Sequence, residues 1–173
     1  MTSNPDQRDL IKPAGIIVMG VSGCGKSTVG SLLAARLGWE FYDADDFHPP
    51  ENIAKMSAGI PLTDTDRAPW LDALHHLLQQ SLQAGRHPVL ACSALKEQYR
   101  QTLLAGNEGL HIIHLRGGYA AIQARLTARS GHYMKLELLQ SQFATLEEPP
   151  DAWVVDITPP PNEIVERILQ QLF

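Results

Sequence analysis

The chain has 173 residues, with 14 lysines and arginines against 19 aspartates and glutamates, which gives a net charge of −5. Its length suits one domain, and its 44% hydrophobic and 19% charged residues are globular values that exclude wholesale disorder. The acidic balance gives no net attraction to nucleic acid or to an anionic membrane, so we expect neither as a partner.

The N-terminal residues 1–13 lack the apolar stretch of a secretory signal, and we expect a mobile tail there, ahead of a single domain over 14–173. No run approaches the roughly 20 apolar residues of a membrane span. Two cysteines, Cys24 and Cys92, are too few for a disulfide scaffold. Together these features predict a cytoplasmic location.

Five short apolar runs predict β-strands, and segments with helical periodicity lie between them. The strands are expected at residues 16–19, 39–42, 89–92, 111–115 and 153–157. The helices are expected at residues 26–37, 51–58, 67–84, 95–105, 118–129, 135–147 and 161–172. Asp66 is expected to cap the start of the 67–84 helix and Gly85 its end. Most of the strands lack apolar/polar alternation, and their alternation with helices predicts an α/β fold around a parallel sheet.

The strongest motif is Gly-Val-Ser-Gly-Cys-Gly-Lys-Ser at residues 20–27, a P-loop between an apolar strand and an amphipathic helix. Its glycines allow backbone N–H groups to surround phosphate oxygens. Lys26 is placed to reach the β- and γ-phosphates, and the Ser27 hydroxyl to bind Mg²⁺. We therefore expect a nucleoside triphosphate site made by Gly20, Val21, Ser22, Gly23, Cys24, Gly25, Lys26, Ser27 and Thr28.

Two absences narrow the class of P-loop protein. The third strand ends in Ala91-Cys92-Ser93, so it lacks the acidic residue of the metal-binding motif of ATPases. The sequence also lacks the Asn-Lys-x-Asp motif by which GTPases recognise guanine. A motor or a GTPase is therefore disfavoured. The class that remains is a small phosphotransferase, which binds a second substrate beside the γ-phosphate.

Acidic residues follow the second strand at Asp43, Asp45 and Asp46. Ligands of parallel α/β sheets bind at the carboxyl ends of the strands, so a carboxylate here can orient a substrate hydroxyl or accept its proton. A solvated turn that caps the next helix is the alternative. His48 is a candidate either for a hydrogen bond to a hydroxyl or for capping the turn before Pro49.

Cationic residues occur in two further places. Lys96 and Arg100 are spaced i, i+4 on an expected helix and suit an anionic group such as a carboxylate, although an ordinary solvated face has the same spacing. Residues 109–136 contain no acid. Their arginines predict a lid over about 118–147 that stabilises the transferring phosphoryl group, with a plain surface helix as the alternative. Arg116, Arg125 and Arg129 compete for that role.

In this order the motifs resemble the gluconokinases, a family of P-loop kinases related to the shikimate and nucleoside monophosphate kinases. The resemblance runs from about Gly15 to Pro149. Besides the P-loop it includes Asp43–Pro49, Asn52-Ile53 through Asp66-Arg67, Pro69–Leu71, Cys92–Lys96 with Tyr99-Arg100, Gly131–Met134 and Ser141–Glu147. It implies a three-layer P-loop NTPase fold with a five-stranded parallel sheet and a helical lid. It also implies a homodimer that transfers the ATP γ-phosphoryl group to the 6-hydroxyl of D-gluconate.

The resemblance assigns roles to individual residues. Lys26 and the P-loop amides would hold the ATP phosphates, Ser27 the Mg²⁺, and Asp45 would orient or deprotonate the acceptor hydroxyl. Arg125 would act on the transferring group and Arg129 on ATP. The acceptor would be bound by Asp45, His48, Lys96 and Arg100.

Two positions depart from the family pattern: Cys24 stands where serine is usual, and Ala44 where glycine is usual. Because Cys24 lies near an expected helix N-terminus, we predict a lowered pKa and sensitivity to oxidation.

Three other functions stay open. A kinase for another hydroxy acid, such as shikimate, would have a glycine-rich turn where this chain has Ser93–Lys96. A nucleoside monophosphate kinase would need an Asp-Gly-Phe-Pro-Arg-like segment, which is missing. A nucleotide-binding module without turnover would not need Lys26, Ser27 and Asp45 together.

Overall fold

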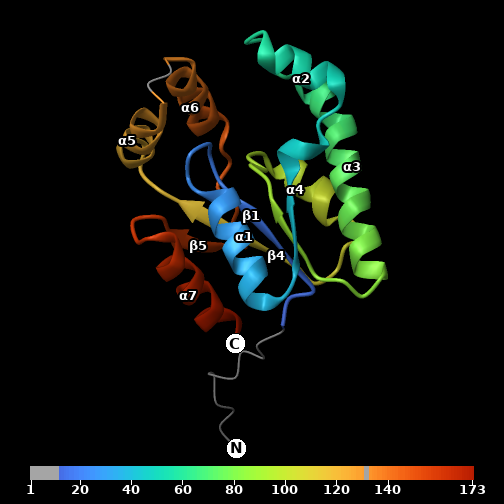
Figure 1. Cartoon of the computed structure of the whole chain (residues 1–173). Coiled ribbons are helices and arrows are strands. Elements are labelled where there is room, and N and C mark those ends of the chain that lie inside the picture. Colours follow the sequence, from blue (N-terminus) through green and yellow to red (C-terminus); the bar gives the residue numbers. More distant parts are fainter. Residues whose placement is uncertain (1–11, 131–132) are drawn as a thin grey trace, which may run out of the picture.

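A twisted sheet of five parallel strands forms the centre of the molecule (Figure 1). The computed structural model describes residues 12–130 and 133–173, without the side chains of residues 129, 130 and 133–136. The strands are β1 (Gly15–Met19), β2 (Glu40–Asp43), β3 (Pro88–Ala91), β4 (Leu110–Arg116) and β5 (Trp153–Asp156). They lie in the order β2-β3-β1-β4-β5. The predicted α/β fold and all five predicted strands are confirmed.

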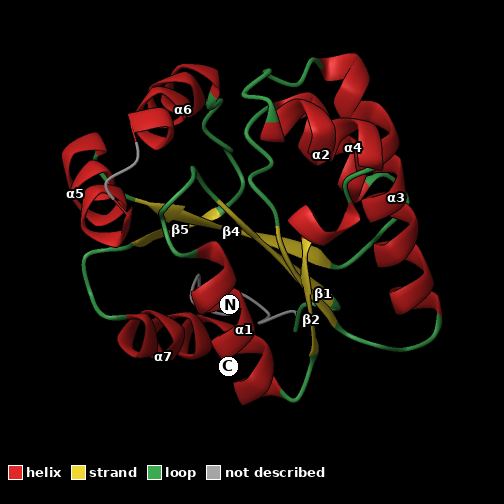
Figure 2. Cartoon of the chain, turned by 45° about the horizontal axis from the view of Figure 1, so that its top comes forward, coloured by secondary structure: helices red, strands yellow, loops and turns green. Residues whose placement is uncertain are grey.

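Helices cover both faces of this sheet and extend beyond the carboxyl ends of its strands (Figure 2). They are α1 (Lys26–Leu37), α2 (Pro50–Ser57), α3 (Asp64–Gln83), α4 (Glu97–Leu104), α5 (Tyr119–Ser130), α6 (Tyr133–Thr145) and α7 (Pro161–Leu172). A short 3₁₀ helix, η1 (Ala44–Phe47), follows β2. Helices α1 and α7 pack on one face and α3 and α4 on the other, so the molecule has three layers.

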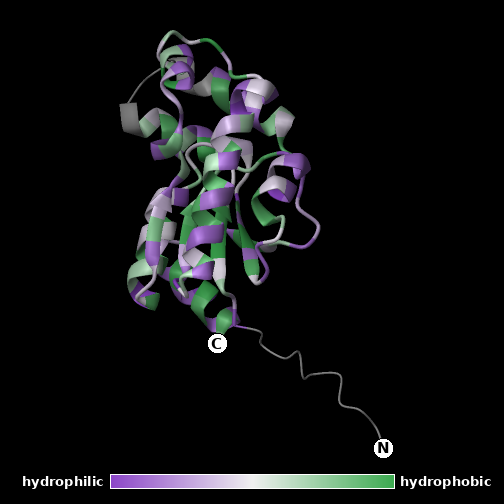
Figure 3. Cartoon of the chain, turned by 90° about the vertical axis from the view of Figure 1, so that its right-hand side faces the viewer, coloured by the Kyte–Doolittle hydropathy of each residue, from purple (hydrophilic) through white to green (hydrophobic). Residues whose placement is uncertain are grey.

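The central strand β1 is buried on both faces, which explains its unbroken apolar sequence. Ile16 and Val18 pack into the cluster beneath α1 and α7. Ile17 and Met19 pack into the cluster beneath α3 and α4. In Figure 3 the hydrophobic colour accordingly dominates the strands, whereas the helices around them carry both colours. Within the described residues, no helix combines the length and the apolar composition that crossing a membrane requires.

The start of α3 differs from the prediction. The helix begins at Asp64, and Thr63, not Asp66, is its N-cap. The Thr63 hydroxyl accepts a hydrogen bond from the Asp66 N–H over 3.1 Å, and the Asp66 carboxylate accepts one from the Thr63 N–H over 2.9 Å. This capping box places Asp66 inside the first turn. Gly85, in the left-handed conformation at φ 69°, follows the C-cap residue Ala84.

The predicted tail falls mostly on residues 1–11, which lie outside the described residues. Pro13 is already buried, and Ala14 donates a backbone hydrogen bond to Gly109. These contacts lie just ahead of β1.

Candidate active site

The P-loop connects β1 to α1 through three glycines with positive φ, Gly20, Gly23 and Gly25. A Cβ atom on Gly20 would lie 2.6 Å from the Cys24 sulfur and 2.8 Å from the Leu115 carbonyl oxygen. Gly25 is the N-cap of α1 and has a left-handed backbone. The loop therefore folds tightly against β4 and presents the N–H groups of the first turn of α1, which is the arrangement that binds phosphate.

Cys24 is buried in this loop, and burial raises the pKa of its thiol. The charge of Lys26 and nearby backbone groups act in the opposite direction but do not compensate for the lost hydration. The prediction of a lowered pKa is therefore wrong, and the predicted sensitivity to oxidation loses its basis. Position beside a helix N-terminus lowers a thiol pKa only when the sulfur keeps enough contact with polar surroundings.

Ser27, in the first turn of α1, and Asp43, at the carboxyl end of β2, are in direct contact. The Ser27 hydroxyl donates a hydrogen bond to Asp43 Oδ2 over 2.5 Å. The other Asp43 oxygen accepts from the Asp45 N–H over 3.0 Å and so caps η1. The acid beside the P-loop serine thus comes from the end of β2 instead of β3. The predicted site residues did not include Asp43, although it belongs to the acidic cluster seen in the sequence.

Asp45 has a raised pKa. The main cause is loss of hydration to neighbouring protein groups, although part of the side chain is exposed, and the second is the negative charge of the Asp43 carboxylate. The positive charge of Lys26 partly offsets these effects. Lys26 itself lies across the P-loop, with its ammonium group 3.1 Å from the Val21 carbonyl oxygen. A carboxylate with a raised pKa beside a P-loop lysine is suited to proton transfer.

His48 lies flat on Trp70, with the ring centroids 4.3 Å apart and the planes at 12°. The Trp70 indole N–H donates to the Ala44 carbonyl oxygen over 2.7 Å, which fixes the ring beneath η1. His48 Nδ1 lies 3.4 Å from the side-chain nitrogen of the buried Asn52. Burial lowers the pKa of His48, so the neutral imidazole is favoured and can exchange hydrogen bonds with a hydroxyl group.

Lys96 and Arg100 do not converge as the sequence predicted. Helix α4 begins at Glu97, so Lys96 is its N-cap and has an extended backbone. The i, i+4 argument needs both residues inside the helix. The Lys96 ammonium pairs with the Asp64 carboxylate at 3.0 Å. The Arg100 guanidinium is buried and donates to the carbonyl oxygens of Ala94 and Leu95, so backbone groups of this chain already occupy it.

Arg67 is a cation near His48 that sequence reasoning missed. It lies on α3, donates to the Leu62 carbonyl oxygen over 2.9 Å and lies 3.4 Å from the Tyr99 hydroxyl. Its positive charge contributes to the lowered pKa of His48, so the two side chains are close enough to interact electrostatically. The Asp66-Arg67 pair within the family pattern was the signal that could have identified it.

On the other side of the P-loop, Arg125 of α5 donates a hydrogen bond to the Ile157 carbonyl oxygen after β5. Arg116 lies 3.6 Å from a Glu148 carboxylate oxygen. The Arg129 side chain lies outside what the structure describes. A cavity of ≈ 810 Å³ lies here, and its lining includes Val21, Gly117, Arg125, Phe143 and Thr158. It is large enough for a nucleoside beside the P-loop.

The segment of α5 and α6 is also connected to the P-loop directly. The side-chain oxygen of Gln142 on α6 accepts a hydrogen bond from the Ser22 N–H. Tyr119 and Phe143 pack edge to face, with centroids 5.4 Å apart, and join α5 to α6. The two helices therefore form one unit against the phosphate-binding loop.

Comparison with protein families places the site in a known group. The family model described as shikimate kinase matches residues 22–172. The probable gluconokinase of Rattus norvegicus is 50% identical over 156 residues, covering 79% of this chain and 84% of that protein. The gluconokinase of Gluconobacter oxydans is 48% identical over 151 residues, covering 87% and 84%. The thermoresistant gluconokinase of Escherichia coli is 43% identical over 158 residues, covering 89% and 90%.

Solved structures agree. The crystal structure of a gluconokinase from Sinorhizobium meliloti is 44% identical and superposes with a TM-score of 0.83, covering 93% of this chain and 92% of that one. The shikimate kinase of Aquifex aeolicus, at 19% identity and a TM-score of 0.57, shares the fold. On the match to the family model and on the identity to these relatives, the chain belongs to the shikimate kinase family of P-loop kinases and, within it, to the gluconokinases.

Proposed function

We propose that the chain transfers the γ-phosphoryl group of ATP to the 6-hydroxyl of D-gluconate, giving 6-phospho-D-gluconate and ADP. The observation that carries the proposal is Asp45, a carboxylate with a raised pKa beside Lys26 of the P-loop. Its setting supports a base or orienting group for an acceptor hydroxyl next to the γ-phosphate. The 43–50% identity to named gluconokinases supports gluconate as that acceptor.

The nucleotide would be held by the P-loop. The backbone N–H groups of residues 20–28 would surround the phosphates, and Lys26 would leave the Val21 carbonyl for the β- and γ-phosphates. The cavity beside Arg125 and Thr158 would take the nucleoside.

Mg²⁺ fits this site as a metal shared with the nucleotide. No cluster of three or more His, Cys, Asp or Glu side chains among the described residues could hold a metal ion. The Ser27 hydroxyl and the Asp43 carboxylate are hard oxygen donors that would hold Mg²⁺, and phosphate oxygens and water would supply the remaining ligands. When bound, the ion would neutralise charge that develops on the phosphates.

The acceptor would bind on the side of η1, α3 and α4. Asp45 would orient the attacking hydroxyl or accept its proton, and neutral His48 would bond a neighbouring hydroxyl. Lys96 would bind the carboxylate of the sugar acid, and we add Arg67 to this side because its charge reaches His48. Arg100 is not retained as a substrate ligand.

Residues 118–147, a range that includes α5 and α6, would act as the lid of a single kinase domain over 14–173. Arg125 would leave the Ile157 carbonyl to contact the transferring phosphoryl group, and Arg129 would contact ATP. We also propose a cytoplasmic homodimer, on the family resemblance alone.

Shikimate is a second candidate acceptor, because the family model that matches residues 22–172 is described as shikimate kinase. The turn after β3, Ser93–Lys96, lacks the glycines expected for that substrate, which favours gluconate. Phosphorus and proton NMR of the product would test the proposal. Coupling of the new phosphate to the two C6 protons of gluconate supports it, and a phosphate at another carbon would refute the assigned hydroxyl.

A further inference from the structure

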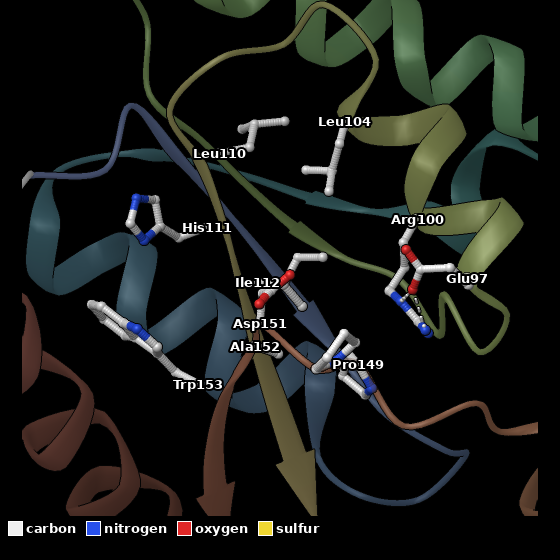
Figure 4. Close-up of a pocket in the computed structure, with 11 residues that line it drawn as sticks. Glu97, Arg100, Leu104, Leu110, His111, Ile112, Pro149, Asp151, Ala152 and Trp153 are labelled. Carbon is white, nitrogen blue, oxygen red and sulfur yellow. Dashed lines mark hydrogen bonds and ion pairs between the residues drawn. The ribbon is translucent and has the colours of Figure 1, made fainter.

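Arg100 is a buried cation that contacts backbone oxygens and the Glu97 carboxylate. Its side chain is 2% exposed, and Nη1 donates to the carbonyl oxygens of Ala94 over 2.8 Å and Leu95 over 3.0 Å. Nη2 pairs with the Glu97 carboxylate at 2.8 Å. Figure 4 shows the two side chains facing each other at one end of a cavity of ≈ 240 Å³ between α4 and strands β4 and β5.

The oxygens that Arg100 holds belong to a strained turn. Ala94 has φ 44°, and it is the only residue other than glycine with a positive φ in the part of the chain that the structure describes. A residue with a Cβ atom stays in this conformation only when its surroundings determine it. The two hydrogen bonds from Arg100 to Ala94 and Leu95 supply such a constraint.

This turn contacts the site on two sides. On one side, the Ser93 carbonyl oxygen accepts from the N–H of the P-loop residue Gly20 over 3.4 Å. On the other side, Lys96 follows directly and pairs with Asp64. A shift of Ala94 would therefore move Lys96 relative to the P-loop.

The same turn also holds the end of the α5–α6 segment. The Glu147 N–H donates to the Leu95 carbonyl oxygen over 2.8 Å. The Glu147 carboxylate accepts from the Glu97 N–H over 2.8 Å and so caps α4, whose own N-cap residue offers no side-chain bond. Leu95 is thus contacted by Arg100 on one side and by Glu147 on the other.

We propose that Arg100 is a positioning residue for phosphoryl transfer: by holding Ala94 and Leu95 in the left-handed turn, it fixes Lys96 at the acceptor and Glu147 at the base of α6. The part that concerns Lys96 rests on the proposed function. Arginine is suited to this task because its rigid fork donates to two carbonyls and one carboxylate together, whereas the single ammonium of lysine cannot match all three positions.

The test compares Arg100→Lys with the wild type and with Arg167→Lys, a matched control at an exposed pair with Glu163 on α7. We expect Arg100→Lys to raise the KM for gluconate about tenfold and to leave the KM for ATP within about twofold, because a displaced group weakens binding locally. The control should change neither. An unchanged KM for gluconate in a folded Arg100→Lys enzyme would overturn the proposal. A lower yield of folded enzyme, with both KM values as in the wild type, would also overturn it, because Arg100 would then serve stability alone.

Amide hydrogen exchange provides a second measurement that needs no substrate. In Arg100→Lys the amides of Glu97 and Glu147 should exchange about tenfold faster, while the amide of Ile17 in β1 should be unchanged. Should Arg100→Lys not fold, Glu97→Gln removes the carboxylate that orients the guanidinium, so the bonds from Arg100 to the two carbonyls should weaken. Faster exchange at Glu147 in Glu97→Gln supports the proposal, and wild-type exchange there refutes it. A wild-type enzyme that does not phosphorylate gluconate would refute the proposed function, and the exchange rates would still decide the role of Arg100.

Discussion

The Ser27 hydroxyl donates a hydrogen bond to the Asp43 carboxylate over 2.5 Å, which joins the first turn of α1 to the end of β2. Strand β3 lies between β1 and β2 in the sheet and has no acidic residue at its carboxyl end. The hydrogen bond therefore connects segments that follow the two strands on either side of β3. The pair therefore gathers two oxygen donors at the P-loop from separate segments. We propose that these oxygens organise Mg²⁺.

Ser27→Ala should raise the Mg²⁺ concentration needed for half-maximal turnover by about tenfold, because one donor and its orientation by Asp43 are lost. A Mg²⁺ titration at saturating ATP measures this. Ser31→Ala, which removes an exposed hydroxyl on the same helix, is the control. An unchanged Mg²⁺ requirement in Ser27→Ala would exclude Ser27 from the metal site.

Asp45→Asn should lower kcat by about 10²- to 10⁴-fold, the usual range for removal of a general base, with little change in ATP affinity. Because burial and Asp43 raise the pKa of Asp45, the wild-type kcat should fall with acidification at a pH above the ordinary carboxyl value of 3.8. The measurement is a kcat–pH profile with ATP binding by calorimetry, and Asp46→Asn is the neighbouring control. Equal losses of turnover and ATP affinity would instead make Asp45 a structural or metal-site residue.

Asp66 should make stability depend on pH. Hydrogen bonds from Lys55, followed by the bond from the Thr63 N–H, lower its pKa to about 2. A lowered folded-state pKa contributes stability that is present above the unfolded value of 3.8 and is lost as pH falls through about 2. The Tm difference between wild type and Asp66→Asn should therefore shrink as pH falls from 4 toward 2. Asp72→Asn, an exposed site on α3, should show no such trend. A constant Tm difference would contradict this account.

Both thiols should react slowly in the folded protein. Burial raises the pKa of Cys24 and raises that of Cys92 to about 12, so little thiolate is present at neutral pH. Timed labelling with iodoacetamide, followed by mass spectrometry, should show complete labelling only after denaturant is added. Rapid modification of Cys24 in the native protein would mean that the P-loop opens.

The sequence predicted the strands well because burial on both faces leaves long apolar runs, as in β1. It also predicted the P-loop, whose glycines have positive φ angles that residues with a Cβ atom rarely adopt. It missed η1, because a single 3₁₀ turn has no periodicity to detect.

The site was less predictable because side-chain direction depends on where helices begin. Lys96 and Arg100 share a face only if the helix starts before Glu97, and it does not. The burial of Cys24 and the contact between Ser27 and Asp43 depend on the order of strands and the packing of loops, which no local pattern encodes.

The most direct test of the central proposal is ADP release with ATP and Mg²⁺ in the presence of gluconate, related sugar acids, shikimate or nucleoside monophosphates. We predict ADP release that depends on gluconate, with a kcat/KM at least about 10²-fold above that for shikimate. Equal or greater turnover with shikimate would contradict the assigned acceptor. No release that depends on any acceptor would contradict the assignment of the chain as a phosphotransferase for these substrates.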